Sequence, residues 1–406
     1  MRAALVPLLA ASLLAAPASV RAATPPVQPP TGPGGAEYGP AEVVKRGLGR
    51  ASAATFAFHA PGEAQSPRPV VVLLPAWGVT NPQAYGGWIE HLARKGYLVL
   101  FPRYQEVNRT KPSEATKAAA ALVRSALAEL ANDPAAKPDL GRVALIGHLA
   151  GAPVAANLAA LARSENLPVP KLVHLVMPGG IATGDNARGI PLGDLSGIDP
   201  ATLMVTQIGD REHLASDRAA KRLLREASAV PLTRKLFLRT LSDDHGFPTL
   251  SATLTSPGSV KEGYEAAAIK LPADPPPPRD ARGRPVKEPQ PKWSAEATLS
   301  GEQSILVQQL GNASTDTLDY LAYWKTFELA AAAAFAGRDA QALRTDPVFV
   351  DMGRWSDGWP VKRLSAEVPR IDPPAGEARS EAKPETKPDA RSTATPASRA
   401  ERGVTR

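Results

Sequence analysis

Short runs of consecutive apolar residues recur through the middle of the chain, and amphipathic stretches separate them. The runs lack polar alternation, which is typical of strands buried on both faces. They predict strands at Ala54–His59, Val70–Leu74, Leu98–Phe101, Val143–Ile146, Leu172–Met177, Leu203–Ile208 and Lys235–Thr240. The spacing predicts helices at Tyr85–Lys95, Ser113–Asn132, Ala152–Arg163 and Asp217–Glu226. This alternation predicts an α/β fold with a doubly wound, mostly parallel sheet, followed by extra helices near the C-terminus.

The regions outside these elements differ from them in composition. Residues 1–22 carry Arg2 and a short apolar run, which predicts a signal peptide cleaved before Ala23. Residues 23–37 are rich in Pro and Gly and are expected to form a poorly ordered linker. The folded domain is expected at 38–365, with a Pro-rich insertion at about 272–291. Residues 366–406 hold almost no large apolar side chain and are expected to form a disordered tail.

Charge and cysteine content narrow the functional classes. The chain has no cysteine, which excludes disulfides and a lipid anchor on cysteine. The net charge is +7, without a basic stripe interleaved with aromatic residues, so we expect no binding to nucleic acid. After the leader, no apolar stretch is long enough to span a bilayer. We therefore expect an exported protein, periplasmic or secreted, without a transmembrane segment after cleavage.

The sequence Gly147-His148-Leu149-Ala150-Gly151 joins a buried strand to a helix rich in small residues. A strand, a tight glycine turn and a helix are the setting of the G-x-S-x-G nucleophile elbow. The position that would carry the serine is Leu149, which has no heteroatom to attack a carbonyl. His148, the residue before it, is expected to pack and to form hydrogen bonds rather than to react.

Several further stretches resemble a branch of bacterial α/β-hydrolases related to secreted esterases and polyester hydrolases. One such stretch follows the second predicted strand and includes Asn81-Pro82, Tyr85, Trp88-Ile89 and Phe101-Pro102-Arg103-Tyr104-Gln105. The other includes Tyr323-Trp324-Lys325 and Met352-Gly353-Arg354-Trp355-Ser356-Asp357-Gly358. The resemblance implies an α/β-hydrolase fold over residues 40 to 365. It also implies an oxyanion loop, which here reads Pro75-Ala76 where related enzymes often carry His-Gly. Proline has no N–H to donate, although Ala76 and Trp77 do.

The acid and histidine positions admit alternatives. The acid is Glu212 or Asp210, both in the loop after Leu203–Ile208. From its position after the last predicted strand, His245 is the natural candidate for the histidine. The resemblance instead aligns Leu254 with the family's histidine, and we favour this alignment. His245 would then be a structural neighbour of the site.

These residues predict a hydrolase-like protein without serine-hydrolase activity, in which the pocket is lined by Ala76, Trp77, His148, Leu149 and Ala150. It would act by binding a small apolar or ester-like ligand, or a protein of the cell envelope. The alternative is an active carboxylic-ester hydrolase with a relocated, water-based site that uses His245 and Glu212. We expect no cofactor. We also expect no metal, because the possible ligands have no recognised spacing: His148, Glu212, His213, Asp244 and His245.

Overall fold

A computed structural model of the chain describes residues 22–40, 42–50, 53–106, 109–183, 188–211, 213–272, 276, 279–285, 299 and 303–370. The predicted signal peptide up to residue 21, Glu212, much of the Pro-rich insertion and residues 371–406 lie outside this part. No helix within the described part has the length and apolar character needed to cross a membrane.

A nine-stranded sheet forms the centre of the fold, with strand order β1-β2-β4-β3-β5-β6-β7-β8-β9. The strands from β4 through β3 and β5 to β8 run parallel, as predicted, whereas β1, β2 and β9 pair antiparallel with their neighbours. The bounds are β1 Val44–Arg50, β2 Ala53–His59, β3 Arg68–Leu74, β4 Leu98–Pro102, β5 Pro138–His148, β6 Leu172–Val176, β7 Leu203–Gly209, β8 Lys235–Thr240 and β9 Ser365–Glu367.

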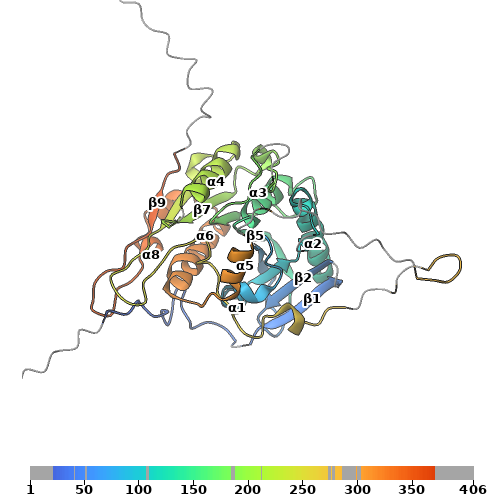
Figure 1. Cartoon of the computed structure of the whole chain (residues 1–406), viewed down its shortest axis with the longest axis horizontal. Coiled ribbons are helices and arrows are strands. Elements are labelled where there is room, and N and C mark those ends of the chain that lie inside the picture. The colour runs from blue at the N-terminus through green and yellow to red at the C-terminus, as the bar shows by residue number, and fades with distance from the viewer. Residues whose placement is uncertain are drawn as a thin grey trace, which may run out of the picture. The chain divides into compact units, whose positions relative to one another are not determined.

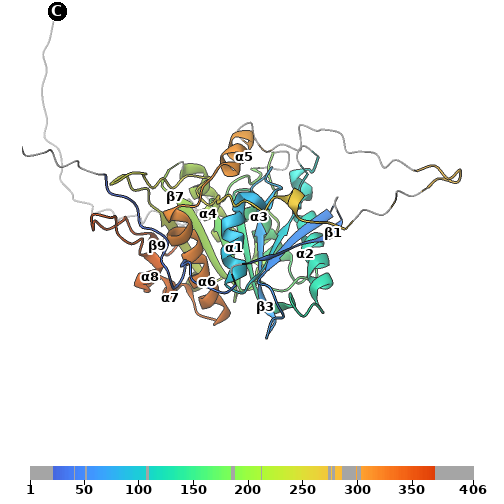
Figure 2. The ribbon, with the colours of Figure 1, turned by 90° about the horizontal axis from the view of Figure 1, so that it is seen from below.

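Helices cover both faces of the sheet (Figures 1 and 2). One face carries α1 Gly86–Arg94 and α6 Lys325–Phe335, together with the π-helix Asp319–Trp324 that leads into α6. The other face carries α2 Ala115–Leu130, α3 Gly151–Leu161 and α4 His213–Glu226. The other α-helices in the described residues are α5 Gln303–Gly311, α7 Ala340–Arg344 and α8 Pro347–Val350, which together with α6 are the extra helices expected near the C-terminus.

The central strands are apolar throughout because both faces are covered. In β3, Val70 to Leu74 have no exposed surface, and the same is true of Leu98 to Phe101 in β4. Burial of this kind contributes roughly 25 cal/mol per Å² of apolar surface, so these strands supply much of the stability of the fold. Their carboxyl ends lie along one edge of the sheet, where functional residues of doubly wound folds gather.

The N-terminal segment 23–37 was expected to be a poorly ordered linker, but it packs along the body. The carbonyl oxygen of Ala23 accepts a hydrogen bond from Phe247 N (2.8 Å). Thr24 N donates to Ser356 Oγ, and Ser356 N donates to Thr24 O, both at 2.9 Å. Further along, Gly34 N donates to Glu328 Oε1 (2.8 Å). Proline has few backbone conformations to lose, which lowers the entropy cost of ordering this segment, and glycine widens the set of conformations that it can adopt. A segment rich in both can therefore follow this path along the body.

The C-terminal boundary also differs from the expectation. β9 continues beyond residue 365, and Leu238 of β8 is registered with Ala366. The ordered body therefore extends into the segment predicted as tail, because an edge strand needs backbone pairing on only one side and few apolar residues. The rest of that segment, residues 371–406, lies outside the described residues.

Candidate functional site

The turn between β5 and α3 has the geometry of a nucleophile elbow. Leu149 has φ +51°, the left-handed region that side chains other than glycine rarely adopt. A Cβ on Gly147 would lie 2.5 Å from the carbonyl oxygen of Gly151, and a Cβ on Gly151 would lie 2.0 Å from that of Leu74. Both contacts are with backbone, so only glycine fits at these two positions. The chain therefore retains the strained turn with leucine at its apex.

Leu149 is fixed by its backbone and covered by neighbouring residues. Its N–H donates to Val176 O (3.1 Å), and its carbonyl oxygen accepts from Gly179 N (3.2 Å) and Ala152 N (3.0 Å). Its side chain belongs to the hydrophobic core, and the residue is only 8% exposed. At the apex of the turn, Leu149 therefore presents apolar surface packed among apolar neighbours.

His148 connects the elbow to two other loops. Its Nε2 lies 2.8 Å from the carbonyl oxygen of Leu254, and its Nδ1 lies 2.7 Å from the hydroxyl of Tyr85. A carbonyl can only accept, so Nε2 carries the proton and Nδ1 accepts from Tyr85. The Tyr85 oxygen in turn accepts from the N–H of Ala76 (3.2 Å). These contacts form one relay from the oxyanion loop to the segment that contains Leu254, and we assign the histidine tautomer from it.

The oxyanion loop is held from several sides. Tyr104 donates its hydroxyl hydrogen to Pro75 O (2.6 Å), and Gln105 bonds Ala76 O (2.9 Å) and Gly78 N (2.6 Å). The N–H of Ala76, which could stabilise an oxyanion, is directed at the Tyr85 hydroxyl. The loop is thus locked in an arrangement that satisfies its own polar groups.

The five residues predicted to line the pocket are all buried. Their exposed fractions are Ala76 2%, Trp77 4%, His148 0%, Leu149 8% and Ala150 2%. All of the apolar members belong to the continuous core. Above Ala150, a Cβ on Gly180 would lie 2.9 Å from Ala150 Cβ and 3.1 Å from Leu299 Cδ1, so this wall is closely packed.

The acid loop is used to hold other loops together. Asp210, at the end of β7, accepts from Ser242 N (2.9 Å) and Ser242 Oγ (2.5 Å). Ser242 Oγ also accepts from Ala252 N (2.9 Å), which ties the ends of β7 and β8 to the segment that leads to Leu254. The other acid candidate, Glu212, lies outside the described residues.

His245 forms a pair with a carboxylate from the C-terminal region. Its Nε2 lies 2.7 Å from Asp357 Oδ2, and its ring stacks on Trp359 at a centroid distance of 5.5 Å and an interplanar angle of 12°. The hydrogen bond with His245 lowers the pKa of Asp357. The contacts of His245 with described residues involve its own loop and residues 355–359, whereas the segment of Leu254 reaches the elbow.

Sequence reasoning missed the roles of Tyr85 and of the Leu254 carbonyl. Tyr85 was noted as part of a matching stretch, but its hydroxyl gives no sign in the sequence of reaching His148, which is 63 positions away. A backbone carbonyl carries no sequence signal at all. Metal ligation was not expected, and the described residues contain no cluster of three or more His, Cys, Asp or Glu that could hold a metal ion.

We predict that two buried histidines make the fold sensitive to acid. Burial lowers the pKa of His148 and of His174 to about 4. The unfolded chain takes up these protons near its ordinary histidine pKa of about 6.5, so stability is full above that pH and falls as the pH approaches 4. Each histidine should cost up to about 3 kcal/mol over this window.

Urea unfolding at about pH 7.5 and about pH 4.5 measures this loss of stability. His174 stacks on Phe327 and contacts Gln207, so His174→Phe keeps the packing while removing one titrating group. The variant should lose less stability on acidification than the natural protein. Equal losses in the two proteins would contradict the assignment to His174.

One comparison with known proteins agrees with this fold. A family model described as the alpha/beta hydrolase fold matches residues 76–230, which include Ala76 of the oxyanion loop, the elbow and the end of β7. The chain has the α/β-hydrolase fold. Among solved structures, carboxyl esterase 2 from the mycorrhizal fungus Tuber melanosporum is similar to this chain at 16% identity, covering 50% of this chain and 76% of its own, with a TM-score of 0.38. None of the curated proteins matches the chain.

Proposed function

We propose that this protein is an α/β-hydrolase-fold protein without serine-hydrolase activity, which acts by binding. The observation that carries the proposal is Leu149 at the apex of an otherwise complete elbow. Ser-His-acid catalysis needs an oxygen nucleophile and a base within hydrogen-bond reach of it. Leucine offers no lone pair, so the first covalent step of ester hydrolysis has no donor at this position.

The groups around Leu149 support the same proposal. The segment that would supply the base presents the Leu254 carbonyl to His148, and His148 is neutral and bonded on both ring nitrogens. The Ala76 N–H is engaged by Tyr85. The turn has the two glycines that its geometry requires, and the polar groups around it are hydrogen-bonded to one another. This combination supports a fold that is kept for its shape and not for catalysis.

We further propose that the protein is exported, in agreement with the signal-like residues 1–22, and works in the periplasm or outside the cell. Its ligand would be a small apolar or ester-like molecule, or a protein of the cell envelope. The apolar character of the residues at the elbow supports the first of these. The mixed charges of residues 366–406 are the feature that motivates the second.

A second candidate function is favoured by the pair of His245 and Asp357. A histidine hydrogen-bonded to a carboxylate can act as a general base toward water. The exposed position of this pair would admit a substrate, since the His245 side chain is 29% exposed. This candidate is an active ester hydrolase with a relocated site, in which Asp357 takes the role expected of Glu212.

The two candidates predict different results for hydrolysis of p-nitrophenyl butyrate. We expect the purified natural protein to match the rate in buffer alone, with or without added divalent metal ions. His245→Ala should therefore leave the rate unchanged, and Asp244→Ala is a matched control from the same loop. Turnover above buffer that is lost in His245→Ala and kept in Asp244→Ala would overturn the first proposal in favour of the second.

A further inference from the structure

A cavity of about 570 Å³ lies at the carboxyl edge of the sheet, and none of its lining residues comes from the elbow. Its walls are formed by Ala53 at the start of β2, by the segment after β4, and by one face of α2. β2 runs antiparallel to β4, and Thr55 is registered with Pro102, so the start of β2 and the end of β4 meet at this edge. The volume is within the usual range of small-molecule sites, about 300–1,000 Å³.

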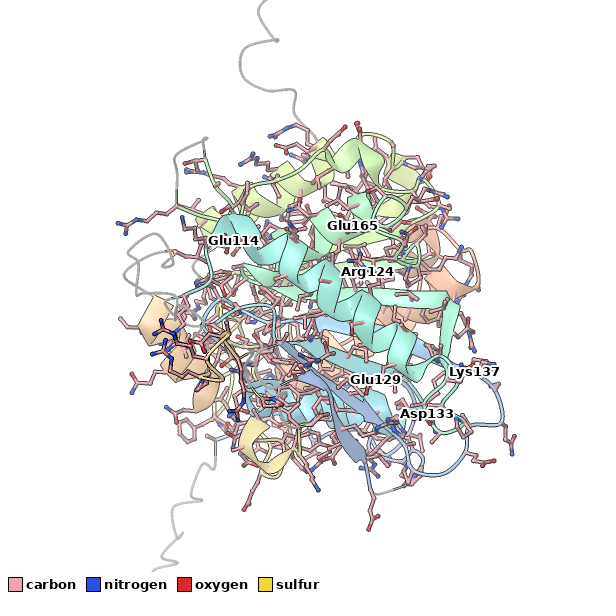
Figure 3. All side chains as sticks on the ribbon, turned by 90° about the vertical axis from the view of Figure 1, so that its right-hand side faces the viewer. Glu114, Arg124, Glu129, Asp133, Lys137 and Glu165 are labelled. Atoms are coloured by element: carbon pink, nitrogen blue, oxygen red, sulfur yellow. The ribbon has the colours of Figure 1, made fainter. Side chains whose placement is uncertain are left out.

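The floor of the cavity is an apolar face of α2. Ala118, Ala121 and Leu122 lie at spacings of three and four residues, which place them on one side of the helix. α2 crosses the face shown in Figure 3, from the side of Glu114 to that of Glu129. Between Ala118 and Ser125, both in the lining, the helix rises about 10 Å, so the floor is elongated. Small side chains leave this length of apolar surface uncovered.

Two arginines, Arg103 and Arg109, are among the residues that line the cavity. Arg109 Nη1 lies 3.2 Å from Glu106 Oε2, in a pair whose side chains are 47% and 32% exposed. Ion pairs at such exposure are worth at most about 1 kcal/mol, and arginine has five donors, so Arg109 can also bind an incoming anion. The other acidic residue of the lining, Glu114, lies at the start of α2, where the helix dipole attracts a carboxylate.

The inner wall of the cavity connects it to the oxyanion loop. Tyr104 and Gln105, which line the cavity, are the residues whose polar atoms hold Pro75, Ala76 and Gly78. A ligand in the cavity would therefore rest against the supports of that loop. The cavity lies at the end of β4, and β3 separates β4 from β5, the strand that leads into the elbow.

We propose that this cavity binds an aliphatic carboxylate, with the chain along Ala118, Ala121 and Leu122 and the carboxylate at Arg109 and Arg103. The inference rests on the proposed binding function and gives that function a site and a ligand class. An elongated apolar floor fits an alkyl chain, and a forked guanidinium group matches a carboxylate in geometry and charge.

Isothermal titration of the full chain with decanoate and with decanol tests the head group. We expect decanoate to bind at least about tenfold more tightly than decanol, because a charge-assisted hydrogen bond is worth about 1.5–3 kcal/mol. Arg109→Gln should weaken decanoate by about tenfold. Arg124→Gln is the matched control, because Arg124 lies on the same side of the molecule (Figure 3) and pairs with Glu165, and neither residue lines the cavity. Equal binding of the acid and the alcohol would overturn the assignment of the head group.

A second pair of variants tests the position of the chain. Ala121 is exposed on α2, so Ala121→Trp fills the cavity without entering the core, and Ala121→Ser keeps it open. We expect the first variant to abolish decanoate binding and the second to preserve it, with thermal unfolding confirming that both fold. Binding unchanged in Ala121→Trp, or absent from the natural protein, would refute this site. Esterase turnover is measured in a separate assay. A lack of decanoate binding is therefore distinguishable from a failure of the proposal that the protein has no serine-hydrolase activity.

Discussion

Replacing Leu149 with Ser and Leu254 with His together should give this protein measurable esterase activity, whereas either substitution alone should give almost none. Leu149→Ser supplies an oxygen at the apex of an elbow whose backbone already has the required conformation. Leu254→His supplies a base from a segment whose backbone already contacts the neighbouring His148. Nucleophile and base act as a unit, so restoring one of them recovers little.

The expected gain in esterase activity of the double variant follows from the histidine introduced at position 254. A positioned general base contributes about 10²- to 10⁴-fold, so the double variant should exceed Leu149→Ser by at least about a hundredfold in kcat/KM for p-nitrophenyl butyrate. Adding Tyr85→Phe should raise the rate further, because it frees the Ala76 N–H for an oxyanion. Leu149→Ala with Leu254→His is the matched control without a nucleophile. If Leu149→Ser alone were as active as the double variant, Leu254 would not mark the histidine position.

Gly151→Ala should unfold or nearly unfold the protein, although alanine is otherwise the best helix former. The added Cβ would lie 2.0 Å from Leu74 O and 2.7 Å from Pro75 O, both backbone atoms of a buried strand end. Neither can move without displacing β3 from the centre of the sheet. Steric overlap of this kind belongs to the severe class of substitutions, so we expect a loss of more than about 4 kcal/mol.

Urea unfolding monitored by tryptophan fluorescence, together with soluble yield, measures this effect. Gly179→Ala is the matched control, since it is next to the elbow but its Cβ would meet only ordinary contacts at 3.9 and 4.0 Å. The control should retain the natural midpoint. A Gly151→Ala protein with an unchanged midpoint would show that the turn can relax, and it would remove the argument that the elbow geometry is obligatory.

The sequence was sufficient to predict the central sheet, because strands covered on both faces must be apolar along their whole length. β3 and β4 are clear examples. The edge strands β1 and β9 were missed, since an edge strand is paired on one side only and tolerates charge and glycine, as in Val44–Arg50. The π-helix Asp319–Trp324 could not be predicted either, because its aromatic spacing is also that of an ordinary helix packed on the sheet.

Part of the candidate site could also be predicted from the sequence, because that part depends on local features. Gly147, Gly151 and the leucine between them are local features, and they identify the elbow without knowledge of any other loop. The relay from Ala76 through Tyr85 and His148 to Leu254 depends on how distant loops meet. The partner of His245 is likewise 112 positions away, and the sequence offered Glu212 in its place.

The central claim is that the elbow of this protein has no nucleophile, and covalent labelling tests it most directly. The purified natural protein is incubated with a fluorophosphonate and its intact mass is measured, with the double variant Leu149→Ser, Leu254→His as the positive control. We predict an unchanged mass for the natural protein and a stoichiometric phosphonyl adduct on the introduced serine of the control. A stoichiometric adduct on the natural protein would contradict the account, whichever residue carried it.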